Sequence, residues 1–145
     1  LILGIDDPKV GLLNVGEEEG KGNLLAQSAY PLLKENKHIN FTGNIEGRDV
    51  LMEKADVIVC DGFTGNVILK MAESLYEISK EKKIKDEYFE RFNFENYGGT
   101  PVLGVAKPVI IGHGISGAKA FMNMIHLAQI MIEKDVMQKM KEELS

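Results

Sequence analysis

The sequence has one cysteine, Cys60, in 145 residues. No internal disulfide can therefore form, and no cysteine-based metal cluster is available. So few cysteines are typical of a reducing compartment, and we expect a cytoplasmic protein. No hydrophobic run approaches the roughly 20 residues that span a bilayer, and we find no signal-peptide pattern at the start. Cations are outnumbered, with 17 Lys and Arg against 22 Asp and Glu. We expect no nucleic-acid partner, because binding to phosphates needs clustered positive charge.

The composition is that of a globular protein. Hydrophobic residues make up 44% of the chain and charged residues 27%, an ordinary balance for a folded domain. The length fits one domain, which we place over residues 1–145. Because the first residue is Leu1 rather than Met, we expect the chain to be part of a larger protein.

Strand and helix patterns alternate along the chain, which predicts an α/β fold with a mainly parallel sheet. Strands are predicted at residues 10–15, 39–41, 56–60 and 109–111. Helices are predicted at residues 24–34, 46–54 and 116–144, with another directly after Asn66. We expect the four strands to be neighbours with helices on both faces. The charged segment 77–96, which also carries Tyr and Phe, is interpreted as an exposed helical excursion.

Three glycine-rich loops follow predicted strands, where ligands bind in open α/β sheets. The first loop spans residues 14–23, and its glycines allow the backbone to approach a ligand closely. Lys21 lies between two of them and offers a compact charge to an anion. A surface loop with solvated charges is the alternative interpretation. The spacing of a Walker A phosphate loop is absent.

The second loop, residues 61–66, leads into a helix. Thr64 is a candidate N-cap, which would leave the amides of Gly65, Asn66 and Val67 as free donors for an anion. The alternative is simple capping, in which Asp61 and Thr64 satisfy the backbone.

The third loop, residues 112–117, carries His113 between two glycines. Imidazole suits proton transfer near neutral pH, and Ser116 is a candidate cap for the last helix. Ser116, His113 and Asp61 could in principle form a triad, but no GxSxG nucleophile elbow exists, so we reject one.

Five blocks of this sequence occur in the order expected of one family: VGLLNVGEEEGKGN, INFTGNIEGRD, ADVIVCDGFTGNVILK, NYGGTPVLG and IIGHGISGAKAF. The chain resembles the C-terminal half of the bacterial PlsX-type phosphate acyltransferases of phospholipid synthesis. The resemblance implies a three-layer α/β/α sandwich similar to phosphate acetyltransferases and isopropylmalate-type dehydrogenases. It implies acyl transfer from acyl carrier protein to inorganic phosphate, without a cofactor or metal. It also implies a homodimer that associates peripherally with the membrane.

The resemblance assigns candidate roles to the three loops. Lys21 would neutralise charge, Asn66 would face phosphate or the oxyanion, and His113 would donate a proton. The candidate binding and loop-holding residues are Asn14, Gly16, Glu18, Asn44, Asp61, Thr64, Gly65 and Ser116.

Two departures and three alternatives accompany this interpretation. The chain is about half as long as a full member, and residues 77–96 are shorter than the helical hairpin expected there. A coenzyme A-dependent phosphate acetyl- or butyryltransferase is one alternative, and a noncatalytic interaction domain is another. A nicotinamide-dependent dehydrogenase of similar fold would need metal-binding aspartates on a helix, and we find no such cluster.

Overall fold

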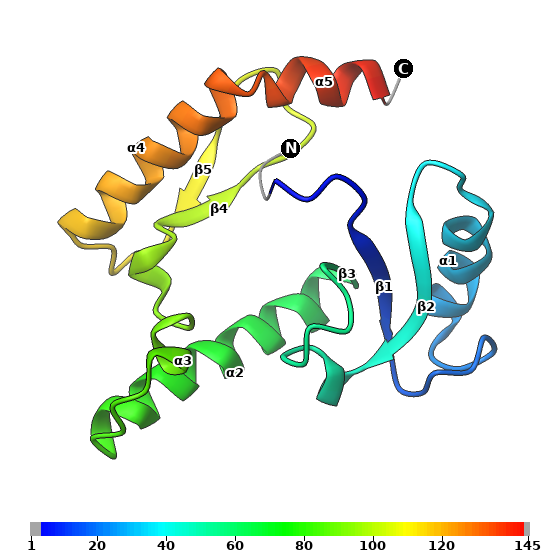
Figure 1. Cartoon of the computed structure of the whole chain (residues 1–145), viewed down its shortest axis with the longest axis horizontal. Coiled ribbons are helices and arrows are strands. Elements are labelled where there is room, and N and C mark those ends of the chain that lie inside the picture. The colour runs from blue at the N-terminus through cyan, green and yellow to red at the C-terminus, as the bar shows by residue number, and fades with distance from the viewer. Residues whose placement is uncertain (1–3, 144–145) are drawn as a thin grey trace. The chain divides into compact units, whose positions relative to one another are not determined.

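The computed structural model describes residues 4–143 (Figure 1). The chain divides into two units, one formed by Ile5–Val67 and the other by the residues from Ile68 onward. Helix α2 (Gly62–Glu81) begins in the first unit and continues into the second.

A parallel three-stranded sheet organises the first unit. Its strands follow the order β2-β1-β3, with bounds β1 (Lys9–Asn14), β2 (Asn40–Glu46) and β3 (Val57–Val59). The central strand buries Val10 and Leu12, and Ile45 of β2 is 1% exposed. These apolar side chains form the core of the unit because β1 has a hydrogen-bonded neighbour on each side.

The second strand is longer than predicted because it does not end at Gly43. Val10 pairs with Phe41 while Gly11 pairs with Gly43, so Thr42 is an extra residue in the ladder. Gly43 has φ +95°, a left-handed value that suits glycine at such a bulge. The strand then continues to Glu46.

Helix α1 (Leu24–Glu35) packs against β1 and β2. It begins where Asn23 Oδ1 accepts from the backbone N of Ala26, a normal N-cap. The helix continues through Pro31 to Glu35, so the proline does not end it. The edge of the Tyr30 ring meets the Phe41 ring of β2, with the centroids 5.3 Å apart, which ties the helix to the sheet.

The helix predicted over residues 46–54 is wrong. The structure has only a 3₁₀ turn, η1 (Gly47–Asp49), in its place. Asp49 Oδ2 accepts from the backbone N of Glu46 at 2.9 Å, one half of a capping box that starts a helical turn. The chain leaves the helical conformation at Glu53, whose φ is +55°.

The second unit consists of helices around a β-hairpin. After α2 its elements are α3 (Glu87–Glu90), η2 (Phe94–Asn96), β4 (Gly99–Pro101), β5 (Ile110–Gly112), α4 (Ala118–Glu133) and α5 (Val136–Glu143). Helix α4 packs on both strands. Ala120, Met131 and Val136 are almost fully buried and form the described core of this unit.

Two predictions for this part of the chain are wrong. The strand expected at residues 109–111 exists, but it pairs antiparallel with β4 in a separate two-stranded sheet. A local hairpin forms because the chain folds back through Val102, whose N donates to Val109 O at 2.8 Å. The single terminal helix is broken at Asp135, whose φ is +52°, so the chain forms α4 and α5.

Gly98 is the point where the chain passes closest to α4. Its φ is +82°, and a Cβ atom there would lie 2.5 Å from Met124 N and 2.7 Å from Ala120 O. These are backbone atoms of a helix, which cannot move aside as a flexible side chain would. Only glycine fits this position.

We predict that Gly98→Ala lowers the free energy of unfolding of the complete protein by about 3 kcal/mol or more, from backbone strain and overpacking together. The matched control is Gly104→Ala, because Gly104 has φ +79° but open space around its Cβ position. It should cost about 1–2 kcal/mol, from the left-handed conformation alone. Urea unfolding measures both variants, and equal losses would contradict the packing argument.

Candidate functional site

The first loop folds back on the end of β1. Asn14 Nδ2 donates to Lys21 O at 3.0 Å, and Asn14 Oδ1 accepts from Val15 N at 2.8 Å. Lys21 N donates to Glu18 O at 3.1 Å. A Cβ atom at Gly22, whose φ is +92°, would collide with the Asn14 amide. Asn14 therefore holds the loop in place, and Gly22 leaves the space that the Asn14 side chain occupies.

The three consecutive glutamates of this loop each lie beside a lysine. The pairs are Glu17 with Lys54, Glu18 with Lys21 and Glu19 with Lys34. Hydrogen bonds to the carboxylates raise the pKa of both Lys34 and Lys54. Lys21 is held more loosely, with Nζ 4.0 Å from Glu18 Oε1 and half of its side chain exposed. Lys21 is therefore the cation of this loop best placed to meet an external anion.

Asn44 and Gly16 complete the first-loop cluster. Asn44 on β2 is 6% exposed, and its Nδ2 donates to Glu18 O at 2.8 Å. Its Oδ1 has no hydrogen-bond partner among residues 4–143. A Cβ atom at Gly16 would lie 2.9 Å from Glu18 Oε2. The Glu18 backbone is thus held by Asn44, which is a structural neighbour of Lys21's loop.

Asp61 caps the start of α2, so the prediction that Thr64 is the N-cap is wrong. Asp61 Oδ1 accepts from Thr64 N at 3.0 Å, and Oδ2 accepts from Thr64 Oγ1 at 2.5 Å. The Thr64 hydroxyl and then the backbone amides lower the pKa of Asp61. Gly65 N donates to Asp61 O at 3.0 Å, so the Gly65 amide is not a free donor. Asp61 thus caps this turn as the simple-capping alternative expects, while the Thr64 hydroxyl bonds to Asp61 and not to the backbone.

The Asn66 side chain lies near this helix start and is available to a ligand. It is exposed, and within the described chain no hydrogen bond to its amide is found. Cys60, just before the loop, lies near Gly65, whose Cβ position is 3.1 Å from Sγ. Burial, and then the charge of Asp61, raise the pKa of the Cys60 thiol. The raised pKa favours the protonated thiol over the nucleophilic thiolate.

His113 directly follows β5 and is surrounded by charged and aromatic groups. Its Nδ1 lies 3.4 Å from Lys70 Nζ, and its Nε2 lies 3.3 Å from Glu73 Oε1. The Phe94 ring lies against it, with centroids 4.5 Å apart. Lys70 and Glu73 were missed by the sequence reasoning. Their spacing was the available signal, because Asn66, Lys70 and Glu73 follow one another at i, i+4 and i+7 of one helix.

Ser116 does not cap the last helix. Gly117 is the N-cap residue of α4 and makes no side-chain bond. Ser116 N donates to His113 O at 3.0 Å, which closes the turn. Its Oγ is inaccessible and has no partner in the part of the chain that the structure describes.

The predicted residues thus fall into three clusters. The first cluster is formed by Asn14, Gly16, Glu18 and Lys21 with Asn44 of β2 beside them. Asp61, Thr64 and Gly65 form the helix start beside Asn66. His113 and Ser116 share the turn after β5, within the second unit.

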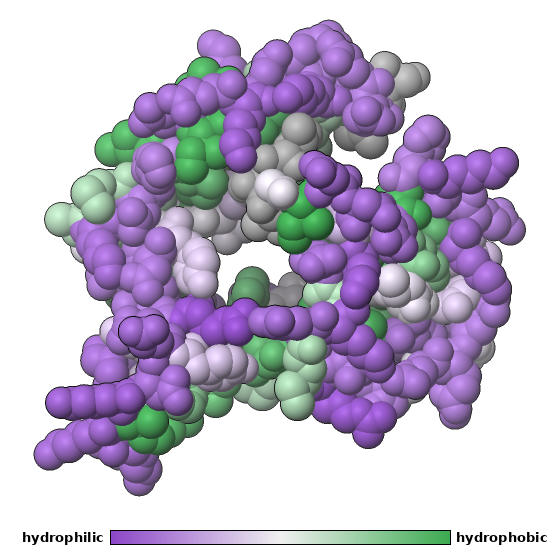
Figure 2. All heavy atoms as spheres, viewed as in Figure 1, coloured by the Kyte–Doolittle hydropathy of each residue, from purple (hydrophilic) through white to green (hydrophobic). Residues whose placement is uncertain are grey.

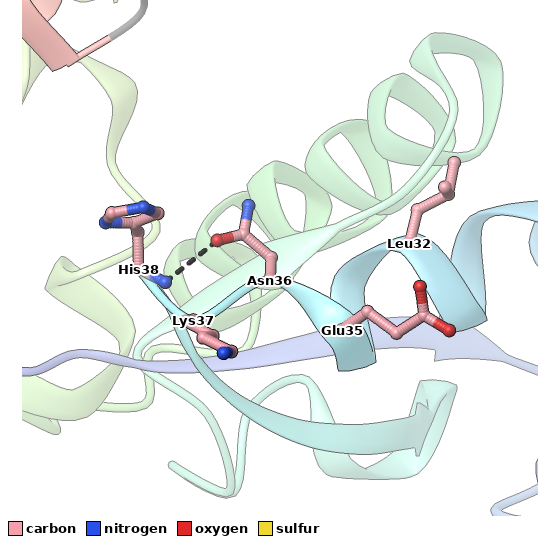
Figure 3. A pocket seen from close by; sticks show the side chains of 5 residues that line it. All are labelled: Leu32, Glu35, Asn36, Lys37 and His38. Atoms are coloured by element: carbon pink, nitrogen blue, oxygen red, sulfur yellow. Dashed lines mark hydrogen bonds between the residues drawn. The ribbon is translucent and has the colours of Figure 1, made fainter.

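An open depression of about 460 Å³ lies away from these residues, at the end of α1 (Figure 3). It is lined by Leu32, Glu35, Asn36, Lys37 and His38. Asn36 Oδ1 accepts from His38 N at 2.9 Å, as the dashed line shows. None of the predicted site residues lines it, so we do not assign it a role in the site.

Comparison with known proteins places the chain in a class of lipid-synthesis proteins. The model of the "Fatty acid synthesis protein" family matches residues 1–87 and 80–139. The chain belongs to this family. A protein named phosphate acyltransferase from Aquifex aeolicus is 45% identical over 159 residues, covering 96% of this chain and 47% of that protein. Its namesake from Dictyoglomus thermophilum is 44% identical over 163 residues, covering 99% and 48%.

The chain therefore spans about half the length of the curated relatives that it matches. The Aquifex alignment is also longer than the 145-residue chain, so that relative carries residues that this chain lacks. The two family matches overlap at residues 80–87, inside the segment that is shorter than the resemblance led us to expect. Within residues 4–143, no helix is long and apolar enough to cross a membrane.

The pH dependence of the helix start follows from the lowered pKa of Asp61. Its folded-state pKa lies below the unfolded value of about 3.9, so it stabilises the fold above that pH. The contribution is lost as the pH falls through the folded-state pKa. We predict that Thr64→Val raises the pKa of Asp61, because the largest cause of the shift is removed.

NMR titration of the Asp61 carboxyl carbon in the complete protein measures this change. Thr100→Val is the matched control, because Thr100 is an exposed residue of β4 and should leave the titration of Asp61 unchanged. An unaltered Asp61 titration in Thr64→Val would contradict the capping assignment.

Proposed function

We propose that the complete protein transfers a fatty acyl group from acyl-(acyl carrier protein) to inorganic phosphate, giving acyl phosphate for phospholipid synthesis. The observation that carries the proposal is the match of nearly the whole chain to relatives named phosphate acyltransferase, at 40–45% identity among the first four. The loops carry group types that this reaction uses: a half-exposed lysine, an exposed carboxamide and an imidazole.

The reaction needs no catalytic serine or cysteine, because phosphate is itself the nucleophile. A phosphate oxygen attacks the thioester carbonyl carbon, which forms a C–O bond and a tetrahedral oxyanion. The C–S bond then breaks, and the departing thiolate takes up a proton. The protein must hold the anion, stabilise the oxyanion and supply the proton.

Lys21 and Asn66 are the proposed groups for the anionic species. Lys21 is a loosely paired cation, 4.0 Å from Glu18, and can exchange that contact for phosphate. The exposed carboxamide of Asn66 can donate to the oxyanion. Because Asp61 satisfies the first-turn amides of α2, side chains rather than that turn carry this binding.

His113 is the proposed proton donor to the thiolate. Ser116 is proposed to support the phosphate site through the turn that it closes with His113, because its Oγ is inaccessible. Asn14, Asp61 and Glu18 hold the loops, in keeping with the hydrogen bonds made by Asn14 and Asp61. Gly16, Asn44, Thr64 and Gly65 complete the proposed set by shaping and supporting these loops.

We further propose a cytoplasmic homodimer with peripheral membrane contact. An exposed apolar face of α4 supports the dimer: Phe121, Met122, Ile125 and Ile132 are each more than half exposed. Hydrophobic side chains gather along α4 in Figure 2. Met131 of the same helix is buried instead, so only part of the apolar surface of α4 is available to a partner. Sedimentation of the complete protein as a monomer would contradict the dimer.

The donor preference tests the proposed reaction. The complete protein, phosphate and either acyl-(acyl carrier protein) or acyl-coenzyme A are mixed, and acyl phosphate is trapped with hydroxylamine. We expect turnover with the carrier-protein thioester. Turnover only with short-chain coenzyme A thioesters would favour a phosphate acetyl- or butyryltransferase. Carrier-protein binding without phosphate-dependent turnover would favour an interaction domain.

Substitutions at the anion groups should separate binding from catalysis. Asn66→Ala should lower kcat by about 10- to 1000-fold, the scale seen when an oxyanion donor is lost. Lys21→Ala should mainly raise the KM for phosphate, because its proposed role is ground-state binding. Lys37→Ala is the control, since Lys37 lines the depression at the end of α1.

The loss of kcat caused by removing His113 should depend on the leaving group of the thioester. His113→Ala should cost about 100-fold in kcat, and less with a thioester whose thiolate leaves easily and needs no proton. Steady-state rates over a series of acyl thioesters measure the effect. An equal loss on every donor would show that His113 is not the acid.

A further inference from the structure

Lys70 of α2 places a positive charge next to His113, the residue proposed to protonate the leaving group. Its Nζ lies 3.4 Å from His113 Nδ1, although the two residues are 43 positions apart in the sequence. About half of the Lys70 side chain and about a third of the His113 side chain are exposed. A molecule that binds against the ring can therefore also reach the ammonium.

Glu73 holds the Lys70 ammonium in this place without using all of its donors. Lys70 Nζ lies 2.8 Å from Glu73 Oε2 and 3.2 Å from Oε1, so both contacts go to one carboxylate. An ammonium has three N–H donors, and an exposed ion pair of this kind is worth about 1 kcal/mol or less. Lys70 can therefore donate to a second anion while Glu73 keeps it on this side of the helix.

Packing also keeps the His113 ring beside α2. The Phe94 ring lies against the imidazole, with the centroids 4.5 Å apart. The preceding residue, Asn93, is 5% exposed, and its Nδ2 donates to the hydroxyl of Tyr76 on α2 at 3.0 Å. The same short segment thus contacts both α2 and the ring, so the closeness of Lys70 to His113 does not depend on the weak ion pair alone.

The proposed reaction develops negative charge on the departing sulfur as well as on the carbonyl oxygen. When the C–S bond breaks, its electron pair stays on sulfur, and the thiolate takes a proton from His113. The sulfur must then lie within hydrogen-bond reach of the ring, which brings it within a few ångströms of the Lys70 ammonium. A positive charge there favours a thiolate and lowers the energy of the transition state in which that charge develops.

We propose that Lys70 is a further catalytic residue, whose ammonium contacts the departing thiolate and stabilises its negative charge without giving it a proton. The inference rests on the proposed function, in which His113 protonates this sulfur. It adds the group that carries the charge of the leaving group before the proton arrives. Neither the DGFTGN loop nor the loop at residues 112–117 contains this residue.

The first test measures the bound product and needs no turnover. The complete protein is mixed with carrier protein that bears its free thiol, and the ultraviolet absorbance of the thiolate is followed against pH. We expect the thiol pKa to be lower in the complex than in the free carrier protein. In Lys70→Met it should rise by about one pH unit, which corresponds to a tenfold loss of thiolate stabilisation. An equal thiol pKa in both complexes would overturn the proposal.

The second test uses the rate of acyl transfer. Lys70→Met should lower kcat about tenfold with thioesters whose thiolate leaves poorly, and less with those whose thiolate leaves easily. Lys70→Arg keeps the positive charge and should retain most of the rate. The matched control is Lys80→Met, because Lys80 and Glu77 form an i, i+3 pair on the same helix, and it should change neither the rate nor the thiol pKa. A raised KM for phosphate with an unchanged kcat in Lys70→Met would overturn the proposal and assign Lys70 to phosphate.

The possible failures of the two proposals are distinguishable. If the protein forms no acyl phosphate but the pKa of the bound thiol depends on Lys70, the proposed function fails and the assignment of Lys70 stands. If acyl phosphate forms but Lys70→Met leaves the thiol pKa and the dependence on the leaving group unchanged, the assignment of Lys70 fails alone. If the carrier protein neither binds nor reacts, both proposals fail.

Discussion

Parallel hydrogen bonding on both sides of β1 is the constraint on which the first unit depends. The register pairs Leu12 with Asn44 and Asn14 with Glu46, so the carboxyl ends of β1 and β2 lie side by side. The first loop leaves β1 at this edge and can rest on Asn44, which bonds to Glu18 O. A shift of one residue would turn Asn44 to the other face of the sheet and remove this support.

Pairing of charges organises both units of this acidic chain. The glutamates of the first loop lie beside the loop's own Lys21 and beside Lys34 and Lys54 from two other segments, and Lys70 bonds to Glu73 on α2. Exposed pairs of this kind contribute little to stability. Their effect here is positional, because each pair limits where a flexible cation can lie. Lys21 and Lys70 are thereby kept near the first loop and the His113 ring, respectively.

Features that depend on the local sequence pattern were predictable from the sequence. Features that depend on contacts with distant parts of the chain were not. The β-branched run of β3 and the apolar β1 were found because parallel strands are typically continuous hydrophobic runs, although β3 lies at the sheet edge with Val57 exposed. Strand β4 was missed because Gly99–Pro101 has no hydrophobic pattern and is a strand only through its pairing with β5. The extra helix at residues 46–54 was predicted because the sequence pattern does not reveal the positive φ of Glu53.

The same distinction applies to the residues of the candidate site. The three loops were identified from their glycines and their places after strands. Asp61 as the cap was left as an alternative, since either Asp61 or Thr64 could accept the first-turn amides. Lys70 and Glu73 were missed because a charged pair at i, i+3 is ordinary on any exposed helix. The pair contacts an imidazole only because the fold brings His113, which is distant in the sequence, next to α2.

The capping of α2 by Asp61 has a consequence for how this family member can select an anion. A carboxylate attached to the chain at the helix start is a permanently present competitor, with a high effective concentration that no soluble ion matches. The helix dipole at this end is thus already neutralised in part by the protein itself. Under the proposed function, anion binding at this loop relies on side chains such as Lys21 instead of rigid main-chain donors. Such recognition is sensitive to ionic strength, because solvent-exposed charges are screened by salt.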